Sequence, residues 1–312
     1  MLNLLRSDLY RITRIRGMRG ALWQYLSVVL GVAVLEVGLN AFVLSQGLGS
    51  LTALDPQRDL ATPSAFLGPA LLGNVSIVGI ASTFGMIEYL FADLNDGFIK
   101  SLTSSLRGRS SYFLEKAAFA GIWSAIMVAA GAAFHLLCVW LLLALPLDVT
   151  FAGLDGAAEF GVWLAGIWLA TWALTVISMA CTLLLRKKLP TYAFASTLVM
   201  GVVPMLVATA ALFAGQSQAF APIAPTLNAV ATWMPSTVLE VLGYGAAGIL
   251  DFASPMPLAE GPMTWLYSIF GSGPSLPVVG PLPVGAWAVL VGALWVTASS
   301  ALFVLVARRC SI

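Results

Sequence analysis

The stretch FADLNDGFIKSLTSSLRGRSSYFLEKA runs from Phe91 to Ala117, between two long apolar runs. It carries seven charged side chains in a chain whose charged fraction is only 9%. A polar segment between apolar runs is typical of a loop that connects two membrane spans. The number of such runs, and the side of the membrane on which this loop lies, therefore decide the fold.

The composition indicates a protein that lies in a lipid bilayer. The 312 residues are 60% hydrophobic and the mean hydropathy is +0.94, whereas soluble domains carry about 25% charged residues. The formal net charge of +1 gives no reason to expect a nucleic-acid partner. The three cysteines lie in apolar stretches or next to the C-terminus, which predicts no disulfide framework.

Six stretches have the roughly 20 apolar residues that a membrane span needs. Backbone polar groups find no water in hydrocarbon, and the runs are continuous rather than alternating, so we predict α-helices and not a β-barrel. The first run is too long for a signal peptide and is predicted to be retained. The predicted fold class is all-α integral membrane, a single transmembrane domain over residues 1–312. Its spans are residues 21–46, 65–90, 113–145, 159–185, 191–214 and 285–307.

The basic residues predict the orientation. With six spans, both termini lie on one side, and that side receives fourteen of the 15 Lys and Arg residues. Only Arg58 falls on the other side. Cytoplasmic loops carry the excess of Lys and Arg in membrane proteins, so we expect both termini and the Phe91–Ala117 stretch to lie in the cytoplasm.

Two cytoplasmic elements are predicted beside the spans. Residues 96–108 form a short helix, because an N-cap candidate, apolar residues at helical spacing and a glycine stop follow one another. Those residues are Asp96, then Phe98, Ile99, Leu102 and Leu106, and Gly108. Residues 1–19 form an amphipathic helix that lies in the membrane surface, with Gly17 and Gly20 at its bend into the first span.

The loop of residues 215–284 is predicted to be external. It holds ten of the 16 prolines. Apolar residues from Trp233 to Leu242 nevertheless recur at helical spacing, which predicts a short helix that packs on the outer leaflet or re-enters it.

No enzyme signature is present in the sequence. It contains no Walker A motif, no nucleophile elbow and no Cys/His cluster with metal-ligand spacing. The G-x-G-x-x-G match at residues 243–248 belongs to no βαβ unit, so it indicates close packing or a loop rather than a nucleotide site. We therefore predict neither catalytic activity nor a metal or cofactor in this chain.

A few polar residues inside or beside the predicted spans are candidates for function. Glu36 and Asn40 lie one turn apart in the first span, where they either line a substrate pathway or form a paired or protonated structural group. His135 is either a packed polar side chain or a proton relay. Glu88 is predicted to lie near Lys100 or Arg107, and Tyr89 and Tyr112 belong to the predicted interfacial aromatic belt, with other Trp and Tyr residues.

Three segments carry a resemblance to a family. They are the opening LLRSDLYR from Leu4 to Arg11, the stretch from Phe91 to Lys116, and Trp233-Met234-Pro235-Ser236. Together with the topology, they resemble the membrane subunit of ABC-2 type exporters of the bacitracin-resistance and lantibiotic-immunity kind. One departure is Phe98, which stands where the family usually has threonine.

The resemblance implies a permease subunit in a bacterial cell membrane, driven by two copies of a separate ATPase subunit that bind ATP and Mg²⁺. A second permease, identical or different, would complete the pathway for a peptide antibiotic, a drug or a lipid-like substrate. The helix at residues 96–108 would be the coupling helix, flanked by the N-terminal helix. Implied coupling residues are Asp93, Asp96, Gly97, Phe98, Ile99, Lys100, Leu102, Leu106 and Arg109, and those of the interfacial helix are Leu5, Arg6, Leu9, Arg11 and Ile12.

Three alternatives stay open. An ion-coupled secondary carrier or channel would use Glu36, Asn40 and His135, and it would be expected to show inverted repeats and broken helices. The sequence shows neither clearly, and Gly201 to Pro204 in the fifth predicted span is the only obvious break. An integral-membrane enzyme would need a nucleophile–base pair or a metal set. A non-transporting immunity or sensor subunit would protect the cell without moving a substrate.

Overall fold

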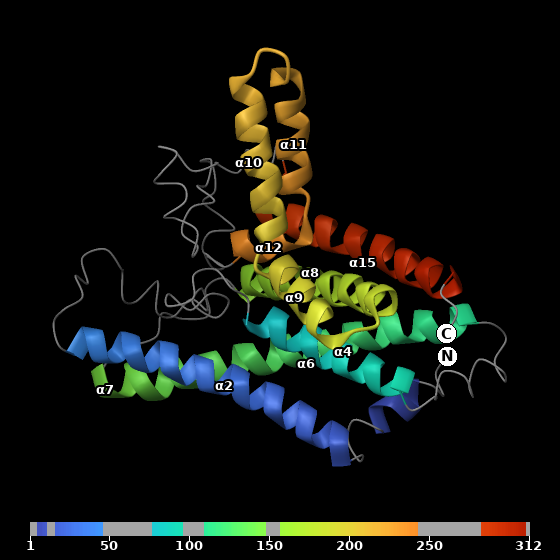
Figure 1. Ribbon diagram of the computed structural model, residues 1–312. Helices are drawn as coiled ribbons and strands as arrows, with labels where there is room; N and C mark the ends of the chain where they lie inside the picture. Colours follow the sequence, from blue (N-terminus) through green and yellow to red (C-terminus); the bar gives the residue numbers. More distant parts are fainter. Residues whose placement is uncertain are drawn as a thin grey trace.

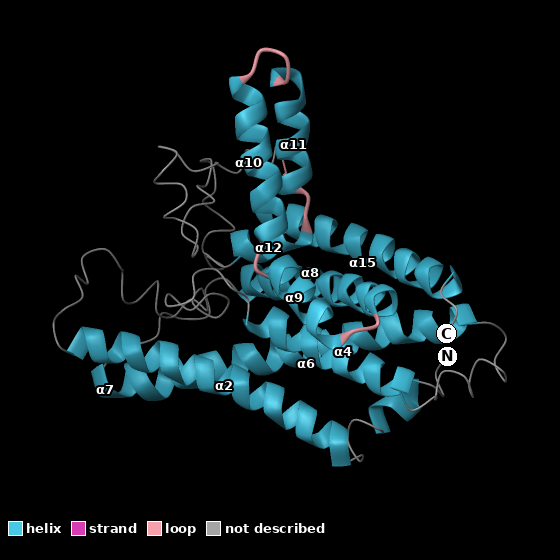
Figure 2. Cartoon of the chain, viewed as in Figure 1, coloured by secondary structure: helices cyan, strands magenta, loops and turns pink. Residues whose placement is uncertain are grey.

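The computed structural model describes residues 5–10, 16–45, 77–95, 109–147, 157–242 and 282–309. Within these ranges the chain consists of helices and short connections, and no strand occurs (Figures 1 and 2). The predicted all-helical class is therefore confirmed for this part of the chain. The longer helices lie roughly alongside one another, and one helical hairpin projects from them (Figure 1).

Four described helices are long and apolar enough to cross a membrane: Ile77–Asn95, Ser110–Leu142, Gly161–Leu185 and Val284–Arg309. A bent pair, α9 (Lys188–Val199) and α10 (Val202–Gln216), would make a fifth if it counts as one span. Helix α2 (Arg16–Ser45) contains a shorter apolar helix, Trp23–Leu39. The chain thus has the helices of a membrane protein, while the six-span arrangement stays a prediction.

The helix limits agree with the predicted spans at some ends and not at others. Helices α8 (Ala157–Leu185) and α15 (Val284–Arg309) match their predicted spans to within about two residues, which is the usual uncertainty of helix ends. Helix α4 (Ile77–Asn95) continues past the predicted end at residue 90, so that end was wrong. Helix α6 (Arg109–Val139) starts before the predicted residue 113 and continues through η2 (Trp140–Ala144) and α7 (Leu145–Leu147).

The N-terminal prediction needs a correction. Residues 5–10 are helical as expected, but α2 already begins at Arg16. The predicted boundary at residue 19 is therefore wrong, and Gly17 and Gly20 lie inside α2 instead of marking a bend.

The predicted fifth span, residues 191–214, is broken in the structure. Helices α9 and α10 meet at 58°, and Gly201 between them has a φ of 72°, a conformation that glycine adopts without steric cost. Pro204, in the first turn of α10, has no N–H to donate back across the break. The break that the sequence indicated between Gly201 and Pro204 is therefore present, and residues 191–214 lie on two helices.

Helix α10 and helix α11 (Ala224–Thr232) form the projecting hairpin, and helix α12 (Pro235–Leu242) follows it (Figure 1). The short helix predicted near Trp233 to Leu242 is therefore confirmed, and Val238 and Leu239 on it are buried. Two indole N–H groups donate to carbonyls on either side of α12. Trp295 Nε1 donates at 2.5 Å to the O of Trp233, the residue that caps α11, and Trp163 Nε1 donates at 2.8 Å to the O of Leu242, the last residue of α12.

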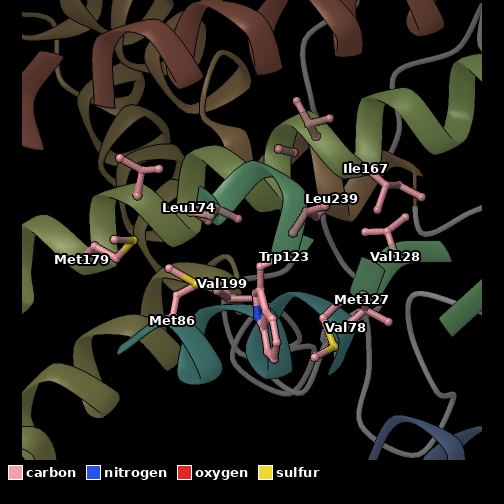
Figure 3. Close-up of a cluster of buried hydrophobic side chains, with 14 of the residues drawn as sticks. Val78, Met86, Trp123, Met127, Val128, Ile167, Leu174, Met179, Val199 and Leu239 are labelled. Atoms are coloured by element: carbon pink, nitrogen blue, oxygen red, sulfur yellow. The ribbon is translucent and has the colours of Figure 1, made fainter. Parts of the chain in front are cut away.

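The core lies between α4, α6 and α8, where Trp123 packs among Met, Val and Leu side chains (Figure 3). Its indole Nε1 donates to Ser82 O at 3.0 Å. Small residues let the helices approach closely, as in many membrane proteins: a Cβ added to Gly292 of α15 would lie 2.6 Å from Leu169 Cβ of α8.

Candidate functional site

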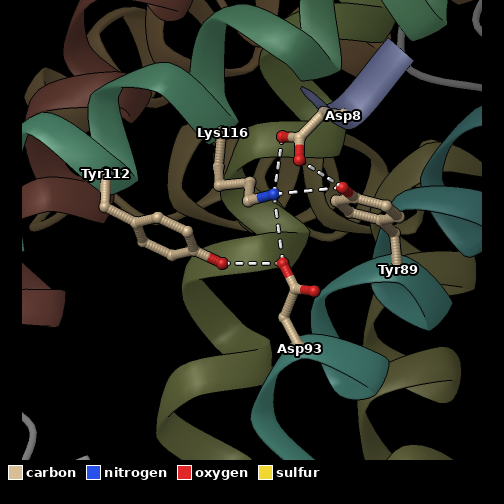
Figure 4. Close-up of polar contacts among 5 residues, drawn as sticks. All are labelled: Asp8, Tyr89, Asp93, Tyr112 and Lys116. Carbon is tan, nitrogen blue, oxygen red and sulfur yellow. Dashed lines mark hydrogen bonds and ion pairs between the residues drawn. The ribbon is translucent and has the colours of Figure 1, made fainter. Parts of the chain in front are cut away.

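A buried lysine lies at the centre of the most polar cluster in the described core. Lys116 of α6 is 0% exposed. Its Nζ donates to Asp8 Oδ2 at 2.6 Å and lies 3.0 Å from Asp93 Oδ2 (Figure 4). Lys116 thus joins the N-terminal helical segment, residues 5–10, to the end of α4 and the start of α6.

Two tyrosines complete this Lys116 cluster. Tyr89 Oη donates to Asp8 Oδ1 at 2.6 Å, and Tyr112 Oη donates to Asp93 Oδ2 at 2.7 Å (Figure 4). Lys116 Nζ also lies 3.2 Å from Tyr89 Oη and 4.3 Å from the centroid of that ring. Each aspartate therefore receives one hydroxyl hydrogen bond in addition to the ammonium group.

Helical spacing explains how the cluster assembles. Tyr89 and Asp93 are four residues apart on α4, and Tyr112 and Lys116 are four residues apart on α6. Residues at i and i+4 share one face of a helix. The facing sides of α4 and α6 therefore each present a tyrosine and one charged residue, and Asp8 enters from the N-terminal segment.

The cluster is costly to bury and is compensated by its contacts. The side chains of Lys116, Asp8 and Asp93 are at most 3% exposed. Taking such charges out of water costs several kcal/mol per ion, which is offset only by good geometry and further hydrogen bonds. The short contacts supply both, so removal of one member would leave an uncompensated charge.

The Lys116 cluster lies beside the segment that the sequence singled out. Asp93 is two residues from the end of α4, and Tyr112 and Lys116 lie in the first two turns of α6. Residues 96–108 connect these two helix ends and lie outside the described residues. The cluster thus links both ends of that connection to the N-terminal segment.

The structure describes two of the predicted coupling residues and does not describe the others. Asp93 is a member of the Lys116 cluster, and Arg109 is the first residue of α6. The remaining ones lie outside the described residues, so their role stays a prediction: Asp96, Gly97, Phe98, Ile99, Lys100, Leu102 and Leu106.

The N-terminal helix buries a different residue from those expected. Leu5 packs against the core, whereas Arg6 and Leu9 are exposed, and Asp8 is 2% exposed. Arg11 and Ile12 lie outside the described residues. The apolar pattern therefore predicted the helix but not the burial of Asp8. The only sequence feature that pointed to it was the position of its carboxyl group between Leu5 and Leu9.

The two pathway candidates, Glu36 and Asn40, both lie in α2, and their side chains are outside the described part of the chain. Tyr89 and Tyr112 are each 1% exposed, so they are not members of an interfacial belt. His135 is likewise buried, on α6.

A second polar contact ties α4 to α9. Lys188 Nζ donates to Glu88 Oε2 at 2.9 Å, and the Tyr192 hydroxyl donates to Glu88 Oε1. The sequence had placed Glu88 near Lys100 or Arg107, which lie outside the described residues; the observed partners come from α9 instead. Both ionic groups are partly exposed, so this pair contributes little to stability.

Glu240 of α12 lies at the break between α9 and α10. Its Oε2 would be 3.6 Å from a Cβ added to Gly201. Burial raises the pKa of this carboxyl from 4.5 to about 8. A carboxyl group that titrates near neutral pH next to a broken helix is a candidate for proton binding.

Among the described residues, no group of three or more His, Cys, Asp or Glu side chains could hold a metal ion. No protein-family model matches the chain, and neither the curated proteins nor the solved structures include a significant match to it.

Proposed function

We propose that this chain is the membrane subunit of an ATP-driven exporter of the ABC-2 type, with ATP hydrolysed by a separate subunit. The observation that carries the proposal is the Lys116 cluster, which joins the N-terminal segment to both helices that flank residues 96–108. A docking helix transmits force only if its two ends are held firmly. Lys116 holds these two ends together, because it lies on α6 and contacts α4.

The charge pattern agrees with this role. Nearly all basic residues fall on the predicted cytoplasmic side, where an ATPase would dock, and the sequence itself has no nucleotide-binding motif. Four of the described helices are apolar and long enough to cross a membrane, or five if the bent pair is one span. Energy from ATP would therefore have to come from a partner.

The proposal is tested by purifying the tagged chain from its native membrane and measuring bound nucleotide-binding protein and ATP hydrolysis. Ile99→Asp/Leu102→Asp places two charges on the predicted apolar face of residues 96–108, and it should abolish both signals. Ser101→Asp/Ser104→Asp is the matched control on the opposite face of the same predicted helix and should retain them. Unchanged association and ATP hydrolysis in the first variant would refute the coupling assignment.

An ion-coupled secondary transporter is the second candidate, and the broken α9–α10 helix favours it. Glu240 at the break would carry the proton. The purified chain alone, in liposomes that contain a pH-sensitive dye, should then move protons without ATP, and Glu240→Gln should stop that flux. Absence of proton movement in the unmodified chain would remove this candidate.

A further inference from the structure

The turn between α8 and α9 presents three exposed cations. It consists of Arg186 and Lys187, and Lys188 follows as the first residue of α9. Arg186 has a φ of 51°, a left-handed conformation that is uncommon for a residue other than glycine. This conformation reverses the chain sharply between the two helices. An unusual backbone conformation in an exposed, basic turn makes the turn a candidate site for recognition of an anion.

Exposed leucines flank these cations on both sides. Leu184 and Leu185, at the end of α8, are 60% and 42% exposed, and Leu189, in the first turn of α9, is 81% exposed. Leucine side chains are unfavourable in water, and ammonium groups are unfavourable in hydrocarbon. Leu189 directly follows Lys188, so the boundary between hydrocarbon and water lies at this turn. Phospholipid headgroups occupy that level of a membrane.

An ion pair positions one of the two lysines. Lys188 Nζ donates to Glu88 Oε2 at 2.9 Å, and Tyr192, one turn further along α9, donates its hydroxyl to the same carboxylate. Lys188 and Glu88 are both partly exposed, so an anion from outside can reach this ammonium group. No described residue pairs with Lys187. Two neighbouring ammonium groups are therefore accessible, and Glu88 competes for one of them.

We propose that the α8–α9 turn binds the phosphate group of an anionic phospholipid through Lys187 and Lys188. The three exposed leucines contact the acyl chains of the same lipid. An acidic protein surface would satisfy the lysines but would leave Leu189 in water. Ammonium groups form strong, charge-assisted hydrogen bonds to phosphate oxygens. Each Lys or Arg near a membrane surface strengthens the attraction to anionic lipid about fivefold.

The test measures which lipids lie beside this turn in the full chain. A bimane fluorophore is attached to Ala193→Cys, an exposed position one turn after Leu189, and the three native cysteines are replaced by alanine. The chain is reconstituted in phosphatidylcholine nanodiscs with a fixed fraction of nitroxide-labelled phosphatidylglycerol or phosphatidylcholine. The ratio of the two quenching constants gives the preference for anionic lipid, which should exceed one and fall with added salt. Nanodiscs present both lipids on both faces, so the result does not depend on the orientation of the chain.

Two substitutions should shift this preference in opposite directions. Lys187→Gln removes one cation and should lower it about fivefold, whereas Glu88→Gln removes the competing carboxylate and should raise it about fivefold. Arg309→Gln removes an exposed cation at the end of α15 and is the matched control, which should leave the preference unchanged. A loss of folding cannot explain a rise, so the two signs separate a binding site from general destabilisation.

Several results would overturn the proposal. These are equal quenching by the two lipids in the parent chain, weak quenching by both, and a preference in Glu88→Gln that does not rise. An equal loss in Lys187→Gln and Arg309→Gln would show a nonspecific attraction to the whole chain. Glycerol 3-phosphate at millimolar concentration should not reduce the quenching, and a reduction would show that the turn recognises a soluble phosphate instead of a lipid. The readout involves neither ATP hydrolysis nor transport, so the proposed function would survive any of these results.

Discussion

Replacing Lys116 by methionine is the sharpest test of the buried cluster. The side chain keeps a similar length but loses the ammonium group, so Asp8 and Asp93 stay buried without their cation. Breaking a buried ion pair from one side costs about 3–5 kcal/mol. Two carboxylates lose the same ammonium group here, which places the expected loss of unfolding free energy at the upper end of that range.

The assay is reversible unfolding in mixed detergent micelles, in which the folded fraction is followed against the mole fraction of SDS. Lys188→Met is the matched control, because it breaks a lysine–carboxylate pair whose side chains are 50% and 37% exposed. Exposed pairs contribute about 0–1 kcal/mol. Equal shifts for the two variants would refute the reasoning.

A third variant separates charge from packing. Lys116→Met combined with Asp8→Asn and Asp93→Asn removes both negative charges along with the positive one. Neutral replacement of a buried ion pair is often nearly without cost, so most of the lost stability should return. If it does not, Lys116 acts through its shape and not through its charge.

Three further predictions follow from single contacts. Gly292→Ala should cost about 1–3 kcal/mol, because its Cβ meets Leu169 and nearby backbone of α8. Glu240 binds its proton more tightly in the folded chain, with a pKa of about 8 against 4.5, so stability should fall by at most about 1.4 kcal/mol per pH unit between these values as pH rises. Trp163→Phe leaves Leu242 O without its indole donor and should cost about 1–3 kcal/mol.

Each of these three predictions is checked by its own measurement. The SDS titration of Gly292→Ala is compared with that of Gly31→Ala, where an added Cβ meets nothing within 4 Å, and equal costs would contradict the close approach of α8 and α15. In Glu240→Gln, the unfolding free energy should no longer depend on pH between these values. A slope that remains would mean that another group causes the pH dependence. Trp23→Phe, at an exposed indole, is the control for Trp163→Phe, and both are followed by the same titration.

The sequence predicted the membrane helices well where apolar runs end in water. The limits of α8 and α15 follow from this contrast. The end of α4 was missed because Asp93 looks like a water-exposed residue but is buried against Lys116. A charge whose partner comes from another helix cannot be recognised by hydropathy, which treats each residue alone.

The candidate site was predicted in its parts and not in its assembly. Asp8, Asp93, Tyr112 and Lys116 all stand in the stretches that resembled a family, yet nothing in their spacing says that two aspartates and two tyrosines surround the Lys116 ammonium group. Such pairing joins residues as far as 108 positions apart. It depends on how the helices pack, which a local pattern does not specify.

The break in the fifth predicted span was predictable in part. The sequence already showed Gly201 and Pro204 as an interruption. The bend of 58° depends on where α9 and α10 find neighbours: α9 pairs with Glu88, and α10 packs beside α11. The existence of the break was thus predictable, and its angle was not.

The two indole hydrogen bonds around α12 have a mechanical consequence. One comes from α15 and the other from α8, so the segment that contains α12 bridges those two helices. Sliding of α15 along α8 would stretch at least one of these bonds. Any swing of the α10–α11 arm should therefore need backbone rotation at both of its bases, at Gly201 before α10 and at Trp233 and Met234 after α11, and it should strain the hydrogen bond to Trp233 O.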